Sequence, residues 1–569
     1  MADAEQNMSM MAPSIPARPR GLSLIEGDQS GKTDTPFPST DQNTGAELGT
    51  EFFAASVSDV DNAANAAWSA FHAARGFEPR RHAELLEQIA QSLGTVSGPL
   101  VEMARVETAL GEKKLQAELR RAVGTLRTYA EAVREGSWVE ATIDRAGAPG
   151  RISANHDLRS MLRPLGPVVV FGASNFPIAY GTLGTDASSA LAAGCPVIIK
   201  GHPLHPGTGE IAAWAAIDAV SRCEFPEGWF QFVHAGGARE AEIGAELVRH
   251  PCVRAGGFTG SKSGGDVLAK MAASRPDPIP FYAEMGSINP VVVLPGALET
   301  EPEKIGRLLA KSVTASLGQQ CTCPGLIFAT KSDGLDRMVG AYVGEIADAE
   351  AAPMLAPRVQ ARFTRRAREM AAMQGVEVLP SAERIPDPPP PGRKVTEAPA
   401  KATPVVFKVS AAIFNAHASL LEEVFGPSTL VVACKDEHEL MRSISAVPGS
   451  LTATMMVGGA DRSLAARIAP MLEHRCGRLI MNGVPTGVEV ARAMVHGGPY
   501  PASNRPDTTA VGHWSMRKWR RSICFQNTPQ ELLPPELRDE NPLGIERIVD
   551  GKRTRAAIES TRPDELEGA

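Results

Sequence analysis

Two spacings of hydrophobic residues divide the chain into helical and extended segments. Between residues 57 and 71, hydrophobic side chains recur every three or four positions, as on one face of an α-helix. We expect Ser58 to cap this helix, with Asp61 three residues later completing the signal. Residues 82–135 continue the helical spacing and are rich in Ala, Glu and Arg. The first part of the chain is therefore predicted to be largely helical.

Unbroken hydrophobic runs follow, rich in β-branched and aromatic residues, as expected for strands buried on both faces. The first three lie at residues 166–171, 195–199 and 229–233. Helical stretches such as 208–220 separate them, and this alternation predicts βαβ units around a parallel sheet. A second series of strands is expected at residues 428–434, 453–458 and 477–482. We therefore expect two α/β domains that meet near Pro290.

Composition narrows the class of protein. The chain has 569 residues, 43% hydrophobic and 22% charged, which are ordinary values for a globular protein. Its net charge of -7 offers no basic excess of the kind that binds nucleic acid. No stretch approaches the roughly 18 consecutive apolar residues of a membrane span, and the N-terminus lacks a secretory hydrophobic core. We expect a cytoplasmic protein without a nucleic-acid or membrane partner.

The eight cysteines do not form a disulfide framework in a chain of this length, and most adjoin apolar residues, as buried structural thiols do. Two stand apart, because Cys321 and Cys323 lie in the polar turn SLGQQCTCPGL at residues 316–326. They could be metal ligands, a redox pair, a nucleophile with a bystander, or neither. A metal site would require further ligands at short spacing, and a disulfide across so tight a loop would be strained. We therefore expect no metal.

Polar side chains follow several predicted strands, where open α/β sheets bind ligands. Asn175, in FGASNFP, is either a turn residue or a donor to a developing oxyanion. Lys200 is either a solvated lysine or a contact to a ribose or phosphate. Residues 256–265 are rich in glycine and precede a helix, so their N–H groups can approach a phosphate. Glu284 ends an apolar segment and is either a helix-facing polar residue or a general base.

Taken together, five motifs resemble the aldehyde dehydrogenase superfamily, in the order found in that family. They are FGASNFP at residues 171–177, GFTGS at 257–261, AEMG at 283–286, GQQCT at 318–322 and EEVFGP at 422–427. The resemblance extends from about residue 22 to about residue 545. It implies an α/β fold with a Rossmann-like cofactor domain, an α/β catalytic domain and a small β oligomerisation extension.

The resemblance also implies a division of the chain. A dinucleotide-binding domain is expected at residues 22–136 and 161–289, a catalytic domain at 290–500, and oligomerisation segments at 137–160 and 501–545. Residues 1–21 are expected to be a disordered leader, 546–569 a flexible tail, and the proline run at 385–394 a stiff surface loop. The family forms dimers or tetramers, and three aromatic residues would suit a buried interface: Trp514, Trp519 and Phe525.

At matching positions, the resemblance implies the roles of the site residues. Cys321 is the nucleophile, Asn175 holds the oxyanion and Glu284 activates water. The implied cofactor contacts are Lys200 near the adenosine ribose, Ser261 at the pyrophosphate beside Gly260 and Gly265, and Glu423 and Phe425 at the nicotinamide ribose and ring. Cys323 matches no role in the family and is interpreted as a small neighbour, or as a protection of Cys321 against overoxidation.

Departures from the family pattern bear on the cofactor and the substrate. After the lysine the family commonly has Pro-Ser/Ala-Glu, whose acidic residue binds the adenosine ribose, but this chain has Gly201-His202-Pro203. A carboxylate there would repel a 2′-phosphate, so its loss predicts NADP as the preferred cofactor, with NAD also usable. His202 could donate to that phosphate. Residues 178–191 also depart from the usual run of small residues, beside the substrate tunnel.

Three further strings, KGHPLHPGT, VHGGPYP and NPLGI, resemble the branch of 2,5-dioxopentanoate dehydrogenases and NADP-dependent fatty aldehyde dehydrogenases. This branch implies that His496 assists thiolate formation or deacylation, the alternative being a histidine that satisfies a glycine turn. The expected reaction is NADP-dependent oxidation of 2,5-dioxopentanoate to 2-oxoglutarate. The alternatives are an aliphatic aldehyde dehydrogenase and, in another class, a non-catalytic binding protein or thiol redox sensor.

Overall fold

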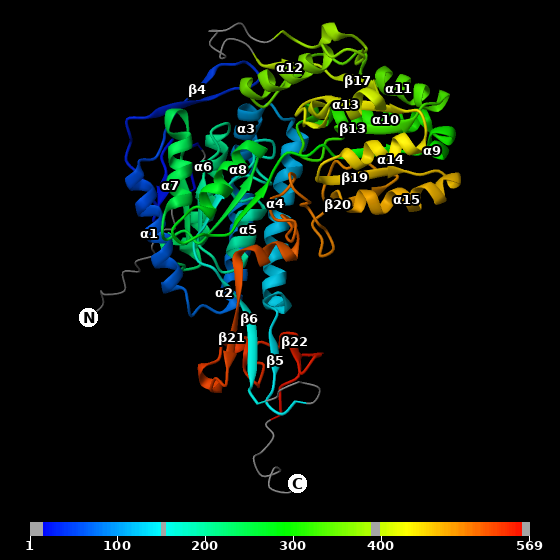
Figure 1. Cartoon of the computed structure of the whole chain (residues 1–569). Helices are drawn as coiled ribbons and strands as arrows, with labels where there is room; N and C mark the ends of the chain where they lie inside the picture. Colours follow the sequence, from blue (N-terminus) through cyan, green and yellow to red (C-terminus); the bar gives the residue numbers. More distant parts are fainter. Residues whose placement is uncertain (1–14, 17, 149–154, 388–398, 560–569) are drawn as a thin grey trace, which may run out of the picture.

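A computed structural model describes residues 15–16, 18–148, 155–387 and 399–559. Two seven-stranded sheets dominate it, as Figure 1 shows. The first has the order β11-β10-β7-β8-β9-β1-β2, and its first five strands are parallel. Its strands are β1 Leu24–Ile25, β2 Asp28–Gln29, β7 Val168–Phe171, β8 Val197–Lys200, β9 Phe230–Val233, β10 Ala255–Thr259 and β11 Phe281–Glu284.

Helices cover both faces of this first sheet. Alternate residues of each strand point to opposite faces, so Val168 and Val170 pack with one group of helices and Val169 and Phe171 with the other. The first group is α2 Pro79–Thr95, α3 Ser97–Thr108, α4 Glu112–Glu135, α5 Thr185–Ala192 and α6 Pro206–Arg222. The second is α1 Val57–Ala73, α7 Glu240–Arg249 and α8 Lys262–Ala273.

The predicted cap of the first helix is wrong by two residues. Ser56, with extended backbone angles, accepts a hydrogen bond from the Asp59 N–H, and the Asp59 carboxylate accepts one from the Ser56 N–H in return. This reciprocal capping box satisfies two donors at the start of α1. The helix therefore begins at Val57, which is 44% exposed. Ser58 lies inside its first turn.

The second sheet has the order β15-β17-β18-β13-β12-β19-β20, and all its pairs are parallel except β15 with β17. Its strands are β12 Pro290–Val293, β13 Leu326–Thr330, β15 Glu377–Leu379, β17 Val405–Ser410, β18 Ser428–Cys434, β19 Ser450–Met456 and β20 Cys476–Met481. Around it lie α9 Pro295–Thr300, α10 Pro302–Thr314, α11 Asp333–Ile346, α12 Pro357–Ala371, α13 Ala411–Ala416, α14 Glu437–Ala446 and α15 Arg462–Glu473. The chain passes from one sheet to the other between Glu284 and Pro290; the division into domains itself stays a prediction.

A third sheet, of five strands in the order β21-β6-β5-β22-β23, projects away from the other two at the bottom of Figure 1. Its strands are β5 Thr142–Asp144, β6 Leu158–Pro164, β21 Arg520–Gln526, β22 Arg547–Val549 and β23 Lys552–Thr554. Two short hairpins complete the strands: β3 Pro36–Thr40 with β4 Glu47–Phe53, and β14 Ala352–Pro353 with β16 Lys401–Ala402.

Two expectations about the ends of the chain are corrected by these contacts. Part of the expected flexible tail forms β22 and β23, because β22 pairs with β5 and thereby extends the third sheet. At the other end, the N–H groups of Arg20 and Gly21 donate to the buried carboxylate of Glu210 at 2.7 and 2.9 Å, so the last residues of the expected leader are held. Residues 1–14, 17 and 560–569, and residues 388–394 of the proline run, lie outside the described residues.

The expected interface aromatics have different environments. Trp519 is fully buried within its own chain, where its indole N–H donates to the Ser189 hydroxyl at 2.8 Å. Trp514 is 51% exposed. Trp519 therefore packs the first sheet's helices and is not available to a partner subunit.

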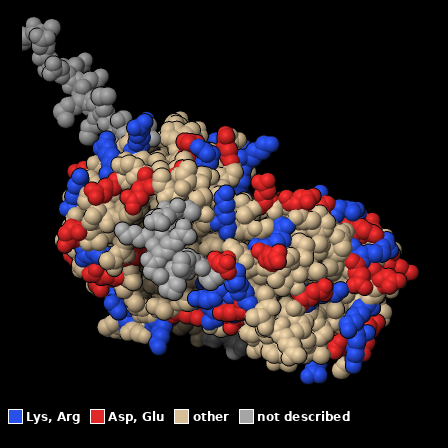
Figure 2. All heavy atoms as spheres, turned by 90° about the horizontal axis from the view of Figure 1, so that it is seen from above, with Lys and Arg blue, Asp and Glu red and all other residues tan. Residues whose placement is uncertain are grey.

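Charged residues of both signs lie on the surface of the molecule. On the face seen in Figure 2, Lys and Arg are interspersed with Asp and Glu. None of the helices in the described part of the chain is long and apolar enough to cross a membrane. Cys524, on β21, is exposed, contrary to the expectation that cysteines outside the turn are buried.

Candidate active site

The ends of the parallel strands of the first sheet bring the predicted polar residues together. Lys200 is the last residue of β8, Glu284 is the last residue of β11, and Asn175 follows β7. The strand order reverses at β7, which lies between β8 and β10. Such a reversal opens a crevice at the carboxyl ends of the strands, where open α/β sheets bind ligands.

The turn that carries Cys321 has an unusual backbone. Helix α10 ends at Thr314, and Ser316, Leu317 and Gly318 follow with φ angles of +52°, +54° and +64°. Two consecutive non-glycine residues in this region cost conformational energy, which surrounding contacts must offset. At Gly318 a side chain is also excluded by space, because a Cβ there would lie 2.1 Å from the carbonyl oxygen of Gly426.

A buried asparagine fixes this turn from the side. The Asn289 amide donates to the carbonyl oxygens of Cys321 at 2.8 Å and of Cys323 at 2.9 Å. Its own oxygen accepts from Ser287 and Thr452, and the residue is fully buried. Asn289 therefore ties the cysteine turn to the second sheet.

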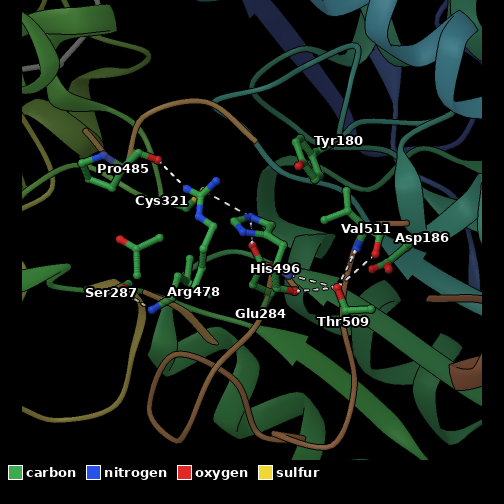
Figure 3. A network of polar contacts seen from close by, with 12 residues as sticks. Tyr180, Asp186, Glu284, Ser287, Cys321, Arg478, Pro485, His496, Thr509 and Val511 are labelled. Carbon is green, nitrogen blue, oxygen red and sulfur yellow. Dashed lines mark hydrogen bonds and ion pairs between the residues drawn. The ribbon is translucent and has the colours of Figure 1, made fainter. Parts of the chain in front are cut away.

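Cys321, His496 and Glu284 form a chain of polar contacts (Figure 3). The Cys321 sulfur lies 3.7 Å from Nε2 of His496, and this same nitrogen lies 3.0 Å from Oε1 of Glu284. The side chains of His496 and Glu284 are only 1% and 8% exposed. The histidine is held by its own backbone, whose N–H donates to the Thr509 hydroxyl at 3.0 Å.

The environment of His496 keeps its imidazole protonated. Burial of the ring works against the charge, but the Glu284 carboxylate and the Cys321 sulfur outweigh it and raise the pKa of His496 to about 10. A cationic imidazole beside the sulfur attracts the negative charge of a thiolate, which is the reactive form of cysteine. The second carboxylate oxygen of Glu284, Oε2, is buried and has no hydrogen-bond partner in the described part of the chain.

Cys323 differs from its neighbour. Burial, with smaller contributions from Glu423 and Cys321, raises the pKa of its thiol to about 12. The Cys323 thiol therefore stays protonated at neutral pH. This environment agrees with its interpretation as a small neighbour in the turn.

Three residues that are far apart in the sequence meet in the fold and form a group of possible metal ligands. The donor atoms of Glu284, Cys321 and His496 all lie within 4.8 Å of one another. Such a set has the chemistry of a zinc site. A metal would have to displace the proton on His496. The contact of one His496 nitrogen with both the sulfur and the carboxylate also suits acid–base and nucleophilic chemistry.

Asn175 reaches the cysteine turn from the first sheet. Its side-chain amide donates to the backbone carbonyl oxygen of Gln319 at 3.0 Å. The backbone carbonyl oxygen of Asn175 accepts from the Lys114 ammonium at 2.9 Å. The amide therefore lies two residues from Cys321 along the turn. An amide N–H in this place can donate to an oxyanion that forms on a carbon atom bonded to the sulfur.

Lys200 and His202, which are expected on the adenosine side of the cofactor, lie together. The Glu240 carboxylate, which the sequence did not lead us to expect, lies beside Lys200. The Lys200 ammonium is 3.4 Å from the Glu240 carboxylate, which also lies 3.5 Å from Arg358. His202 stacks on His205 with ring centroids 4.9 Å apart. Burial, together with the nearby cations, lowers the pKa of His202 well below its usual value, so His202 can meet a phosphate only as a neutral ring.

The glycine-rich turn leads into the start of α8. Ser261 caps this helix by accepting from the Gly264 N–H at 3.3 Å, and the Gly260 N–H donates to the carbonyl oxygen of Glu284 at 3.0 Å. Gly265 allows the helix to approach β11 closely, since a Cβ there would lie 2.7 Å from the sulfur of Met285. The turn therefore links an anion-binding helix terminus to the strand that carries Glu284.

Glu423 lies close to the backbone beside the cysteine turn. It accepts from the Ser287 N–H at 3.3 Å, and a Cβ on Gly286 would lie 2.2 Å from its carboxylate. Burial raises the pKa of Glu423 to about 7. Phe425 is partly buried and packs against the core of the first sheet. Both residues thus lie where the two seven-stranded sheets approach each other.

The sequence did not single out Arg121, Glu240, Asn289 or Arg478, and Tyr180 was included only within the segment 178–191 beside the substrate tunnel. No local pattern marks them, because each reaches the site through the packing of elements far apart in the chain. The exception is Asn289, whose sequence SINP before a buried strand places a polar residue at a strand entrance. That position could have been marked as a buried hydrogen-bonding residue.

Comparisons with known proteins agree with this geometry. A family model described as "Aldehyde dehydrogenase family" matches residues 29–499. The chain is 41% identical to alpha-ketoglutaric semialdehyde dehydrogenase 2 of Azospirillum brasilense, over 88% of this chain and 93% of that protein. It is 37% identical to alpha-ketoglutaric semialdehyde dehydrogenase of Acinetobacter baylyi, over 94% and 99%.

Solved structures show the same fold at low sequence identity. PnpE in complex with nicotinamide adenine dinucleotide superimposes with a TM-score of 0.74 at 19% identity, over 91% of this chain and 100% of that one. The NADP complex of an NADP-dependent glyceraldehyde-3-phosphate dehydrogenase from Bacillus halodurans gives 0.73 at 20%, over 89% and 99%.

Proposed function

The chain belongs to the aldehyde dehydrogenase family, and on that premise we propose that it oxidises 2,5-dioxopentanoate to 2-oxoglutarate with NADP. The two relatives at 41% and 37% identity, both named for alpha-ketoglutaric semialdehyde, support this substrate. The observation that carries the proposal is the contact chain from Cys321 through His496 to Glu284 at the strand ends. It places a nucleophile, a cation and a carboxylate within reach of one carbonyl carbon.

In the first step, the Cys321 thiolate attacks the aldehyde carbon and the carbonyl oxygen becomes negatively charged. The cationic His496, 3.7 Å from the sulfur, stabilises the thiolate before attack. The Asn175 amide exchanges its bond to the Gln319 carbonyl for a bond to the new oxyanion. Both groups are held by neighbouring elements, so they need little rearrangement at the moment of reaction.

A nicotinamide cofactor, when bound, accepts the hydride that leaves the former aldehyde carbon. The residues present fit such a group, because the start of α8 offers free N–H groups to a pyrophosphate and the Glu423 carboxylate offers acceptors to ribose hydroxyls. Lys200, Ser261 and Phe425 would complete its contacts. Loss of the hydride leaves an acyl group joined to the Cys321 sulfur as a thioester.

Glu284 then activates water for hydrolysis of the thioester. Its Oε2 atom is buried and free to accept a hydrogen bond in the described part of the chain, while Oε1 contacts His496. The carboxylate takes a proton as water attacks the acyl carbon, and the sulfur leaves as a thiolate that His496 stabilises. The acid is released, Glu284 gives its proton to solvent, and the site returns to its starting charge.

The preference for NADP rests on the segment after Lys200, which lacks an acidic side chain. Glu240 supplies a carboxylate from another element, but Lys200 and Arg358 lie beside it at 3.4 and 3.5 Å. Two cations around one carboxylate leave a net positive charge that favours a 2′-phosphate. NAD is the alternative cofactor, and the ratio of kcat/KM for NADP and NAD measures the preference.

Assembly as a homodimer or homotetramer is also proposed. It is supported by the third sheet, whose outer strand β21 has exposed residues and, among the described residues, pairs only with β6. A cytoplasmic location stays a prediction, with which the eight free cysteines agree.

Initial rates of NADPH formation with 2,5-dioxopentanoate, hexanal and decanal test the proposed function, with NAD in parallel. We expect the highest kcat/KM for 2,5-dioxopentanoate with NADP. A preference for decanal would move the function to aliphatic aldehydes. The Cys321→Ala variant is the control, and activity surviving in it would overturn the mechanism.

A further inference from the structure

Two arginines for which the described ranges contain no ion-pair partner come to the site from different elements. Arg121 lies on α4, and Arg478 lies on β20 of the second sheet. In the described part of the chain, no carboxylate lies within ion-pair distance of either guanidinium. The close-up in Figure 3 shows the Arg478 side chain extending toward Cys321 and His496. Both cations are thus left without an anionic partner among the described residues.

Each arginine is nevertheless held in position by neutral groups. An Nη of Arg121 donates to the Tyr180 hydroxyl at 2.7 Å, and its guanidinium lies 5.1 Å from the centre of the Tyr180 ring. Arg478 donates to the carbonyl oxygens of Pro485 at 2.6 Å and Gly487 at 3.0 Å. The Nε atom of each arginine is buried and has no hydrogen-bond partner among the described residues.

Arg478 interacts electrostatically with the Cys321 sulfur, with Tyr180 and with Arg121. Burial lowers the pKa of Arg478, the Cys321 sulfur and Tyr180 oppose that shift, and Arg121 adds to it. Tyr180 connects the pair to the reaction centre, because its ring centroid is 6.2 Å from that of His496. Burial also raises the pKa of Tyr180, so its hydroxyl stays a neutral hydrogen-bond donor.

Two partly buried like charges destabilise a protein unless an anion compensates them. The planar guanidinium is the side chain best suited to bind a carboxylate with paired N–H donors. An aldehyde whose far end carries a carboxylate would bring that anion into the site when its carbonyl carbon reaches Cys321. The pair therefore has the position and the chemistry of a substrate-binding subsite.

We propose that Arg121 and Arg478 together bind the carboxylate of the aldehyde substrate, with the Tyr180 hydroxyl as a neutral donor beside them. This inference rests on the proposed function and deepens it, since it names the groups that select an acidic aldehyde over an apolar one. The subsite joins α4 of the first sheet's layer to β20 of the second sheet, so a bound carboxylate contacts both sides of the crevice.

Steady-state kinetics of Arg121→Gln and Arg478→Gln test the inference, with 2,5-dioxopentanoate and hexanal as paired substrates. Loss of one charged hydrogen-bonding group should lower kcat/KM for 2,5-dioxopentanoate about 30- to 100-fold, mainly through KM. Hexanal has no carboxylate, so the loss of kcat/KM for hexanal should be at least about ten-fold smaller than the loss for 2,5-dioxopentanoate. The matched control is Arg120→Gln, an exposed neighbour on the same helix, which should change neither.

Conservative variants and a binding measurement keep the result interpretable if a variant loses stability. Arg121→Lys and Arg478→Lys retain the charge but not the planar fork, so each should recover part of the lost kcat/KM. Without turnover, 2-oxoglutarate should protect Cys321 of the wild-type protein from alkylation by iodoacetamide, and the Gln variants should require a concentration more than ten-fold higher.

The outcomes separate the subsite from the proposed function. Equal losses for both aldehydes, or unchanged kinetics with 2,5-dioxopentanoate in a fully active wild-type protein, would overturn the subsite alone. A wild-type protein that oxidises hexanal but not 2,5-dioxopentanoate would overturn the proposed substrate and the subsite with it. Absence of any aldehyde oxidation by the wild-type protein would overturn the proposed function.

Discussion

At the scale of single residues, the site is governed by charges placed around one sulfur atom. His496 contacts both the Cys321 sulfur and the Glu284 carboxylate through one nitrogen, so the histidine couples the nucleophile to the base. The contact with His496 uses only one oxygen of Glu284, so the second oxygen, Oε2, stays available to a water molecule.

Replacement of His496 by Gln should lower the reactivity of Cys321 over a wide pH range. Because the pKa of His496 is raised to about 10, the wild-type imidazole stays charged from pH 6 through 9 and attracts the negative charge of a thiolate throughout this range. The alkylation rate of Cys321 by iodoacetamide should therefore be about 10- to 100-fold lower in His496→Gln than in the wild-type protein at pH 7, 8 and 9.

Peptide mapping of the alkylated protein is needed for this comparison, since Cys524 is exposed and will also react. His438→Gln is a matched control, because that histidine is exposed on α14. Equal alkylation rates for wild type and His496→Gln at these pH values would contradict the role assigned to the imidazole.

The sequence predicts a site residue when the residues next to it in the chain determine its position. Cys321, Glu284 and Asn175 follow from motifs, because strand ends and turns place them in the crevice by local rules. Arg121 and Arg478 do not, since nothing near either residue distinguishes it from a surface arginine. Glu240 was missed for the same reason, and its ion pair with Lys200 weakens the argument that the segment after Lys200 alone sets the local charge.

At the scale of elements, the turn between α10 and β13 is the strained part of the fold. Left-handed φ angles at Ser316 and Leu317 occur only because contacts on both sides fix the turn. Asn289 holds it from β12, and the backbone of Gly426 packs against Gly318. Rigid placement of the sulfur is the functional result.

Gly318→Ala should damage both stability and activity. A methyl group there would meet the Gly426 carbonyl at 2.1 Å, and the φ of +64° disfavours alanine. We expect the free energy of unfolding to fall by about 1–3 kcal/mol and kcat to fall more than ten-fold as the turn shifts.

Gly340→Ala is the matched control for this substitution. Gly340 lies within α11, and a Cβ there meets no atom within 4 Å. Alanine at an exposed helical position should be neutral or stabilise by about 0.5–1 kcal/mol. Denaturant titration and initial rates measure both variants, and a Gly318→Ala protein as stable and active as wild type would refute the account of the turn.

The elements themselves were predicted from sequence with errors of a few residues, because buried parallel strands are short hydrophobic runs. The cap of α1 was misplaced since Ser56 and Ser58 each have an acidic residue three positions later, and only the observed backbone angles distinguish them. Strands β22 and β23 were missed because their sequence is charged. Pairing of β22 with β5, and of β23 with β22, stabilises them rather than their own hydrophobicity.

At the scale of the whole molecule, the third sheet has an edge that a second copy can use. Strand β21 lies at one end of that sheet, and its exposed side chains include Arg521, Ser522 and Cys524. Exposed edge strands are prone to pair with another chain, and proteins usually protect or use them. Trp519 is buried within its own chain, whereas Phe525 lies on β21 and is partly buried, so β21 itself is the better candidate.

Light scattering coupled to gel filtration should show a dimer or tetramer for the wild-type protein. Cys524→Asp puts a carboxylate in the middle of β21, where it would be desolvated in a strand contact, and should shift the mass toward the monomer. Ser221→Asp, at the exposed end of α6, should leave the mass unchanged. A wild-type monomer at micromolar concentration, or an unchanged mass in Cys524→Asp, would reject this interface.

The central claim is that Cys321 carries the acyl group and Glu284 releases it. The most direct measurement is a rapid-quench reaction of the Glu284→Gln variant with 2,5-dioxopentanoate and NADP, followed by peptide mass mapping. We predict a burst of NADPH close to one equivalent per active site, with the acyl group on the peptide that contains Cys321. No burst and no adduct, or an adduct on Cys323 instead, would contradict the account.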